Sequence, residues 1–107
     1  MGLFSKKEPA YEPPKRPIIV STGNVNRAYE ILDAIFAVDF SAQTWFKAAD
    51  PSASFDGVKT KLQDKCRDMG GDAVICCQFQ YRISINDDVL RKQVAEIWAY
   101  GTAVKFI

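Results

Sequence analysis

Three cysteines are the residues of this chain whose chemistry could support a metal site or a redox reaction: Cys66, Cys76 and Cys77. Thiolates bind soft ions such as Cu(I), so the adjacent pair, with Cys66 as a third ligand, forms a candidate metal site. Successive residues of a strand point to opposite faces, however, unless a bulge intervenes. The pattern therefore favours Cys66 and Cys77 as small core residues and Cys76 as the more reactive thiol.

Histidine is absent from the chain, and this limits the possible chemistry further. Without an imidazole there can be no Ser-His-Asp or Cys-His catalysis and no histidine metal ligand. Gly70-Gly71 is placed to end a helix, whereas a phosphate-binding loop opens one. The sequence therefore predicts no catalytic residues and no cofactor, other than a soft metal ion on the cysteines, and we expect a protein that is not an enzyme.

The composition is that of one small globular domain. The chain has 107 residues, of which 48% are hydrophobic, and its 14 basic and 13 acidic residues give a net charge of +1. This balance argues against a nucleic-acid partner. No apolar run approaches the roughly 20 residues that span a bilayer. An odd number of cysteines is unlike a disulfide framework, so we expect a cytoplasmic protein.

Residues 1–17 differ in composition from the rest of the chain. They hold four of the five prolines together with several charged residues. Proline lacks a backbone donor and fixes φ, so this segment is predicted to be a solvated, extended tail. A docking peptide, or an arm that touches a membrane through Leu3 and Phe4, is the alternative. The folded domain is then residues 18–107.

Strands and helices are predicted from periodicity and turn residues. The most regular segment is a helix with an apolar stripe (Phe55, Val58, Leu62, Cys66 and Met69), capped by Ser54 or Asp56 and ended by Gly70-Gly71. The other expected elements are strands over 18–22, 29–38, 73–85 and 90–106, a short helix over 42–49 and a turn at 86–88. Residues 88–95 could instead form a helical turn.

The two faces of the last two strands are predicted from alternation. In 73–85, Ile75 and Cys77 are expected on one apolar face, with Cys76 on the other. In 90–106, small residues such as Ala99 and Gly101 form one face, which lets a helix or another backbone come close, and larger residues such as Trp98 form the other. One helix cannot cover both faces, so a second copy of the protein is expected to cover the remaining one. Trp45, Trp98, Tyr100 and Phe106 are expected in the core or in this interface.

Three stretches resemble the YbjQ-like family of small bacterial proteins described as heavy-metal-binding. They are Ile18-Ile-Val-Ser-Thr with Tyr29-Glu-Ile-Leu-Asp-Ala, then Met69-Gly-Gly-Asp-Ala-Val-Ile75, and Tyr100-Gly-Thr-Ala-Val-Lys105. The resemblance covers about residues 18–107. Two departures are visible: Ala34 and Ala37 lie where the family usually has glycines, and the segment 39–54 is shorter.

The resemblance implies an α+β subunit of the dodecin type, with a four-stranded antiparallel or mixed sheet and one main helix. Such subunits assemble into rings, typically pentamers, in which short added strands join neighbours. We therefore expect a homo-oligomeric binding or scaffold protein. A soft-metal-binding or thiol-redox protein, using Cys76 with Cys77 or Cys66, is the alternative.

Overall fold

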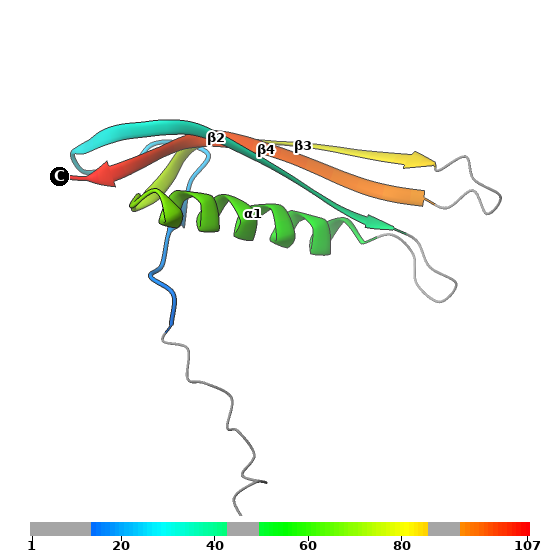
Figure 1. Cartoon of the computed structure of the whole chain (residues 1–107). Helices are drawn as coiled ribbons and strands as arrows, with labels where there is room; N and C mark the ends of the chain where they lie inside the picture. The colour runs from blue at the N-terminus through cyan, green and yellow to red at the C-terminus, as the bar shows by residue number, and fades with distance from the viewer. Residues whose placement is uncertain (1–13, 43–49, 86–92) are drawn as a thin grey trace, which may run out of the picture.

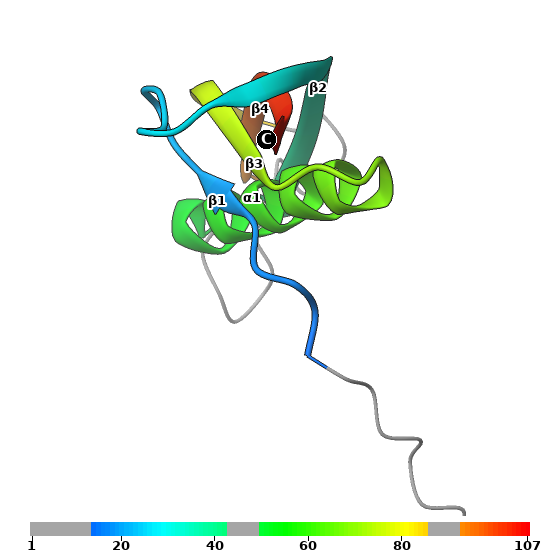
Figure 2. The ribbon, with the colours of Figure 1, turned by 90° about the vertical axis from the view of Figure 1, so that its left-hand side faces the viewer.

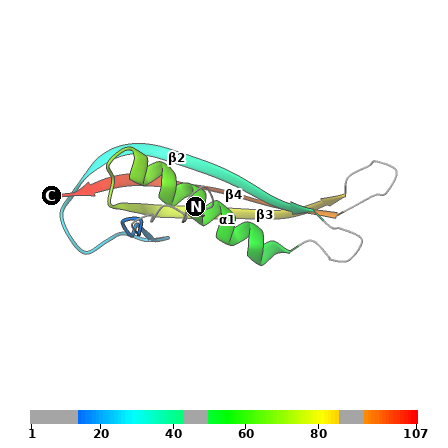
Figure 3. The ribbon, with the colours of Figure 1, turned by 60° about the horizontal axis from the view of Figure 1, so that its bottom comes forward.

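The computed structural model describes residues 14–42, 50–85 and 93–107. They form two layers, a long twisted sheet and a single helix packed lengthwise on one of its faces (Figures 1 and 3). The elements are β1 (Ile19–Val20), β2 (Tyr29–Ala42), α1 (Pro51–Asp68), β3 (Ala73–Ile85) and β4 (Gln93–Phe106). The predicted α+β class, with a mixed four-stranded sheet and one helix, is confirmed.

The strands lie in the order β1-β3-β4-β2, with β4 at the centre between the two other long strands. β1 runs parallel to β3, whereas β4 is antiparallel to both β3 and β2. The β-branched run that begins at Ile18 predicted β1, and the alternating segments predicted β3 and β4. β2 continues four residues beyond its predicted end at Val38.

The main core lies between α1 and the sheet. The helix contributes Val58, Leu62 and Cys66, all fully buried. β4 meets them with Ala99 and Ala103, whose short side chains allow the helix to come close to the sheet. The small-residue face of the last strand is thus the helix-covered face, as predicted.

The helix begins four residues earlier than predicted. Asp50 is the N-cap, and its carboxylate accepts hydrogen bonds from the backbone N–H groups of Ser52 and Ala53. Pro51 follows at the first helical position, where its missing N–H is harmless and its fixed φ suits the helix. The assignment of the cap to Ser54 or Asp56 is therefore wrong. Ser54 lies inside the helix, buried, and its hydroxyl donates to the carbonyl of Ala95.

The helix ends where the two glycines predicted it. Met69 is the C-cap and Gly70 follows with φ +80°, a left-handed conformation that glycine adopts at little cost. The N–H of Gly71 donates to the carbonyl of Cys66, and that of Gly70 to the carbonyl of Arg67. This pair of hydrogen bonds is the Schellman motif, which satisfies carbonyls that the helix leaves free.

A bulge at Cys76 overturns the predicted face of Ile75, whereas Cys77 and Phe79 share one face as predicted. Ile75 pairs with Thr102 and Gln78 with Tyr100, so two cysteines stand opposite the single residue Gly101. Cys76 has φ 52° and is the extra residue. The alternation shifts by one position there. Cys77 therefore packs in the core under the helix, while Ile75 belongs to a small cluster on the opposite face.

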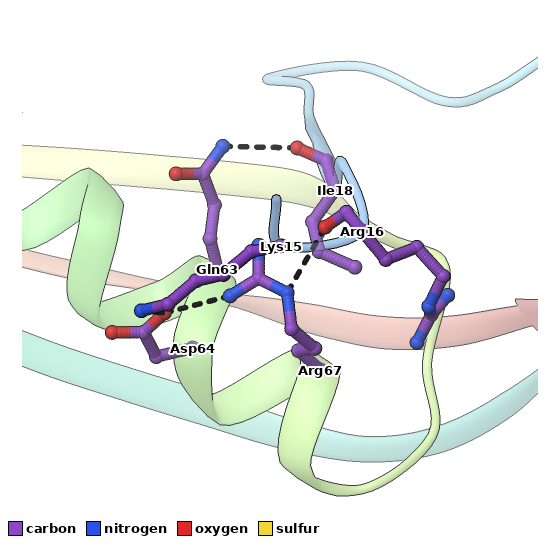
Figure 4. A network of polar contacts seen from close by, with 6 residues as sticks. All are labelled: Lys15, Arg16, Ile18, Gln63, Asp64 and Arg67. Atoms are coloured by element: carbon purple, nitrogen blue, oxygen red, sulfur yellow. Dashed lines mark hydrogen bonds and ion pairs between the residues drawn. The ribbon is translucent and has the colours of Figure 1, made fainter. Parts of the chain in front are cut away.

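Side chains of α1 donate hydrogen bonds to the backbone of an extended segment on each flank of the helix (Figure 4 shows one flank). On one flank, Gln63 donates to the carbonyl of Ile18 and Arg67 to that of Arg16. On the other flank, Lys61 donates to the carbonyl of Val38 and Lys65 to that of Phe36. The donors on each flank are four residues apart in the helix, which is an advance of about 6 Å. Their acceptors are two residues apart in an extended segment, which is an advance of about 6.6 Å, so both hydrogen bonds can form together.

Ion pairs add to these hydrogen bonds along residues 15–18. Lys15 lies 3.4 Å from the carboxylate of Asp64, and Arg16 lies 2.5 Å from that of Asp72. Asp72 also accepts from the backbone N–H of Phe106. The last residues of the predicted tail therefore lie along the helix instead of extending freely into solvent.

Several predictions fall outside the described residues. They concern the short helix over 43–49 with Trp45, the turn at 86–88 and residues 88–92 of the helical alternative. Residues 93–95 belong to β4, so the alternative of a helical turn is wrong there. The first thirteen residues of the predicted tail lie outside as well. Ala42, the first residue of the expected short helix, is the last residue of β2.

The left-handed backbone at Cys76 gives a stability prediction. A residue with a Cβ pays roughly 1–2 kcal/mol for this conformation, whereas glycine does not. We expect Cys76→Gly to exceed Cys76→Ala in free energy of unfolding by about 1 kcal/mol, measured by urea denaturation. Equal stability of the two variants would show that the bulge carries no backbone strain.

Candidate functional site

The three cysteines do not share one environment. Cys66 and Cys77 are fully buried members of the same hydrophobic core cluster, and the thiol of Cys66 contacts the carbonyl oxygen of Ala73 at 3.4 Å. Cys76 is exposed, because the bulge removes it from the core-facing positions of β3. The structure thus brings Cys66 and Cys77 into one cluster and leaves Cys76 at the surface.

Burial sets the protonation of the two core cysteines. It raises the pKa of the Cys66 thiol, against a smaller opposing effect from its hydrogen bond to Ala73. It also raises the pKa of the Cys77 thiol. A thiolate is the form that ligates metals and attacks disulfides, so the environment disfavours the reactive form at both positions.

No group of three or more cysteine, aspartate, glutamate or histidine side chains in the described part of the chain is arranged to hold a metal ion. Ligation by Cys76 with Cys77 or Cys66 stays a prediction. Nor is any helix among these residues long and apolar enough to cross a bilayer.

The outer face of the sheet, opposite α1, carries several exposed aromatic side chains. Cross-strand pairing places Phe36 beside Tyr100, and Val38 beside Trp98, on this face. The aromatic side chains there stay well exposed: Phe36 by 55%, Phe40 by 64%, Trp98 by 44% and Tyr100 by 46%. We call Phe36, Phe40, Trp98 and Tyr100 the aromatic patch.

Polar side chains around the aromatic patch form hydrogen bonds and an ion pair with one another. Tyr100 donates its hydroxyl hydrogen to Gln78 at 2.9 Å, and the indole N–H of Trp98 donates to Glu96. Glu96 also faces Arg82 across the sheet at 3.4 Å. The polar groups of Trp98 and Tyr100 are therefore satisfied within the chain, while Lys65 lies over the ring of Phe36 at 5.2 Å.

Among the described residues, side chains cover one end of the outer face. Ala73, Ile75 and Val104 form a small buried cluster there, closed by Val25, Tyr29 and Phe106. The aromatic patch lies beyond this cover, nearer the other end of the strands, as the bare upper side of the sheet in Figure 1 illustrates.

The two long outer strands differ in how their edges are protected. On β2, the ammonium groups of Lys61 and Lys65 donate hydrogen bonds to the carbonyls of Val38 and Phe36. The backbone N–H of Ala34 donates to the carboxylate of Asp33. Charged side chains on an edge strand prevent another chain from pairing with it. On β3, β1 and the residues after it reach only as far as Cys77, whose N–H donates to Ser21.

The sequence pointed to Trp98 and Tyr100 but missed the two phenylalanines of the patch. Phe36, Val38 and Phe40 recur every second residue, which is the signal for one face of a strand. That signal was hidden because the residues between them, Ala37 and Asp39, belong to a second partly apolar face under the helix.

The fold defines a class: a two-layer α+β domain in which one helix packs on one face of a four-stranded sheet. Residues 56–107 match the family model of YbjQ, described as "Putative heavy-metal-binding". The resemblance to the YbjQ-like family is thereby confirmed over the helix and the β3–β4 hairpin.

The fold is also found in a solved structure. A protein of unknown function from Pediococcus pentosaceus, assigned to the DUF74 family, superimposes with a TM-score of 0.66 at 20% sequence identity. The alignment covers 84% of this chain and 98% of the other. At this identity the likeness extends to the fold alone. A search of curated proteins gave no match.

The different environments of the cysteines predict their order of reaction. We expect a thiol reagent such as DTNB to modify Cys76 rapidly in the folded protein and Cys66 and Cys77 only when the protein unfolds. Cys76→Ser should abolish the fast phase. A fast phase that persists in this variant would contradict the placement of the other two thiols in the core.

Proposed function

We propose that this chain is a non-enzymatic, homo-oligomeric binding or scaffold protein that assembles through the aromatic patch. The exposure of four aromatic side chains on one uncovered sheet face is the observation that carries the proposal. Contiguous apolar surface of this kind marks interaction sites in globular proteins. Aromatic residues are also the commonest anchors of protein interfaces.

A second copy of the chain is the occupant that this surface fits best. Of the charges beside this face, Arg82 and Glu96 pair with each other, and Lys65 lies over the ring of Phe36, 5.2 Å from its centroid. Tyr100 and Trp98 likewise have their polar groups satisfied within the chain. The family resemblance extends the proposal to a ring, with the pentamer as its expected size, and three free cysteines fit a cytoplasmic location.

The oligomeric state tests this proposal directly. Sedimentation velocity should give a species of five times the 12.0 kDa protomer mass at micromolar concentration. Trp98→Ala should weaken assembly about 100-fold, as loss of a central aromatic anchor does. Met69→Ala, which shortens an exposed apolar side chain at the helix end, is the matched control and should assemble normally.

A monomeric wild-type protein would overturn the proposal. An oligomer of another size that Trp98→Ala dissociates would support the interface and reject the pentamer. Assembly that Trp98→Ala leaves unchanged would move the interface away from the aromatic patch.

Soft-metal binding is the second candidate, supported by the exposed thiol of Cys76 and by the description of the matching family. It predicts that Cys76→Ser lowers the affinity for Cu(I) at least tenfold in a competition titration with a chromogenic chelator. Equal affinities of the wild type and this variant would reject Cys76 as a ligand.

A further inference from the structure

The N-terminal segment joins the domain at a fixed point beside α1. Residues 14–18 run past the helix and lead away from the sheet (dark blue in Figures 1 and 2). Their backbone is held because Arg67 and Gln63 donate to the carbonyls of Arg16 and Ile18. The side chain of Lys15 reaches across the helix as far as Asp64 (Figure 4). The thirteen residues that precede this anchor lie outside the described part of the chain.

A hollow lies on the other flank of α1, between the helix and β2. Asp64 belongs to its rim, where it pairs with Lys15 at 3.4 Å and with Arg67 at 2.7 Å. The terminal segment is thus already joined to a residue that lines the hollow. The lining consists of Phe36, Ala37 and Val38 of β2 and Lys61, Asp64 and Lys65 of α1.

The two lysines of this hollow are engaged within the chain. Lys61 pairs with Asp39 at 2.9 Å, and Lys65 donates to the carbonyl of Phe36 at 2.6 Å. With their charged ends held at β2, these side chains present their methylene stems to the hollow. The group that fits between the stems and the strand is therefore apolar or aromatic.

The sequence holds an aromatic residue at a suitable distance from the anchor. Tyr11 precedes Lys15 by four residues, and Pro13 and Pro14 lie between them. Proline favours an extended backbone of about 3.1 Å per residue, so four residues span about 12 Å. A helix with its side chains is about 10–12 Å across, so this length is enough to cross α1.

We propose that the N-terminal segment of this chain crosses α1 and docks Tyr11 in the hollow between α1 and β2. The ion pair of Lys15 with Asp64 directs the crossing, and the two prolines reduce the conformational freedom that docking removes. Leu3 and Phe4 could reach the hollow only through a longer loop, whose closure costs more entropy. The docked segment would cover the edge of β2. The contact forms within one chain, so it does not depend on the proposed assembly.

Chymotrypsin tests the docking on the full-length protein, because it cuts after aromatic residues and the segment holds two of them. The Phe4–Ser5 bond should be cut at the rate found in a free peptide of residues 1–16. The Tyr11–Glu12 bond should be cut about tenfold more slowly than in that peptide, since cleavage follows the undocked fraction. Equal cleavage of the Tyr11–Glu12 bond in protein and peptide would overturn the proposal.

A pair of lysine variants tests the position of the docking site. Lys65→Ser removes a side chain that lines the hollow, and we expect it to return cleavage after Tyr11 to the rate in the free peptide. Lys59→Ser removes an exposed lysine that lines a different hollow, next to β1, and the protection should persist. Equal effects of the two variants would overturn the assignment.

A photocrosslinker at position 11 identifies the contact without altering the hollow. With p-benzoylphenylalanine in place of Tyr11, mass spectrometry should find crosslinks to residues 36–38 or 61–65. Unlabelled and heavy-isotope-labelled proteins are first refolded together, so docking within one chain gives products of a single label. Mixed-label products would show docking on a second copy and overturn the proposal, as would crosslinks confined to other residues.

Discussion

A single helix has to cover a sheet of four strands, and this imbalance governs the whole molecule. α1 buries its stripe against the middle of the sheet, where the alanines of β4 let it come close. The opposite face and the far edge of β3 receive much less cover. The surfaces available for interaction are therefore the ones that the helix does not reach.

Those surfaces differ in chemistry, and the difference separates their roles. The aromatic patch is broad, its polar groups are internally satisfied, and Arg82 pairs with Glu96 beside it. Beside β3, Val20, Phe55 and Phe79 line a hollow together with Lys59. A flat face suits another folded surface.

The sequence predicted the elements well wherever one periodicity was unbroken. The helix and the strands β3 and β4 follow from spacings of three and four and from alternation. The helix start was wrong because Ser54 or Asp56 was expected as the cap, although Asp50 followed by Pro51 makes a good cap four residues earlier. The face of Ile75 was wrong because the bulge residue is a cysteine, and the usual signal for a left-handed residue is glycine or asparagine. The exposed phenylalanines of β2 were missed because both faces of that strand are partly apolar, which masks alternation.

The hydrogen bonds from α1 to the extended segments on its two flanks limit insertions and deletions within the helix. Lys61, Gln63, Lys65 and Arg67 reach their carbonyl partners because helix and extended segments advance in nearly equal steps. Substituting one of these residues removes one hydrogen bond. Inserting or deleting a single residue among them would turn the rest of the helix by about 100° and break the match on both flanks. This stretch of the helix can vary in composition, but its residue count is fixed by geometry.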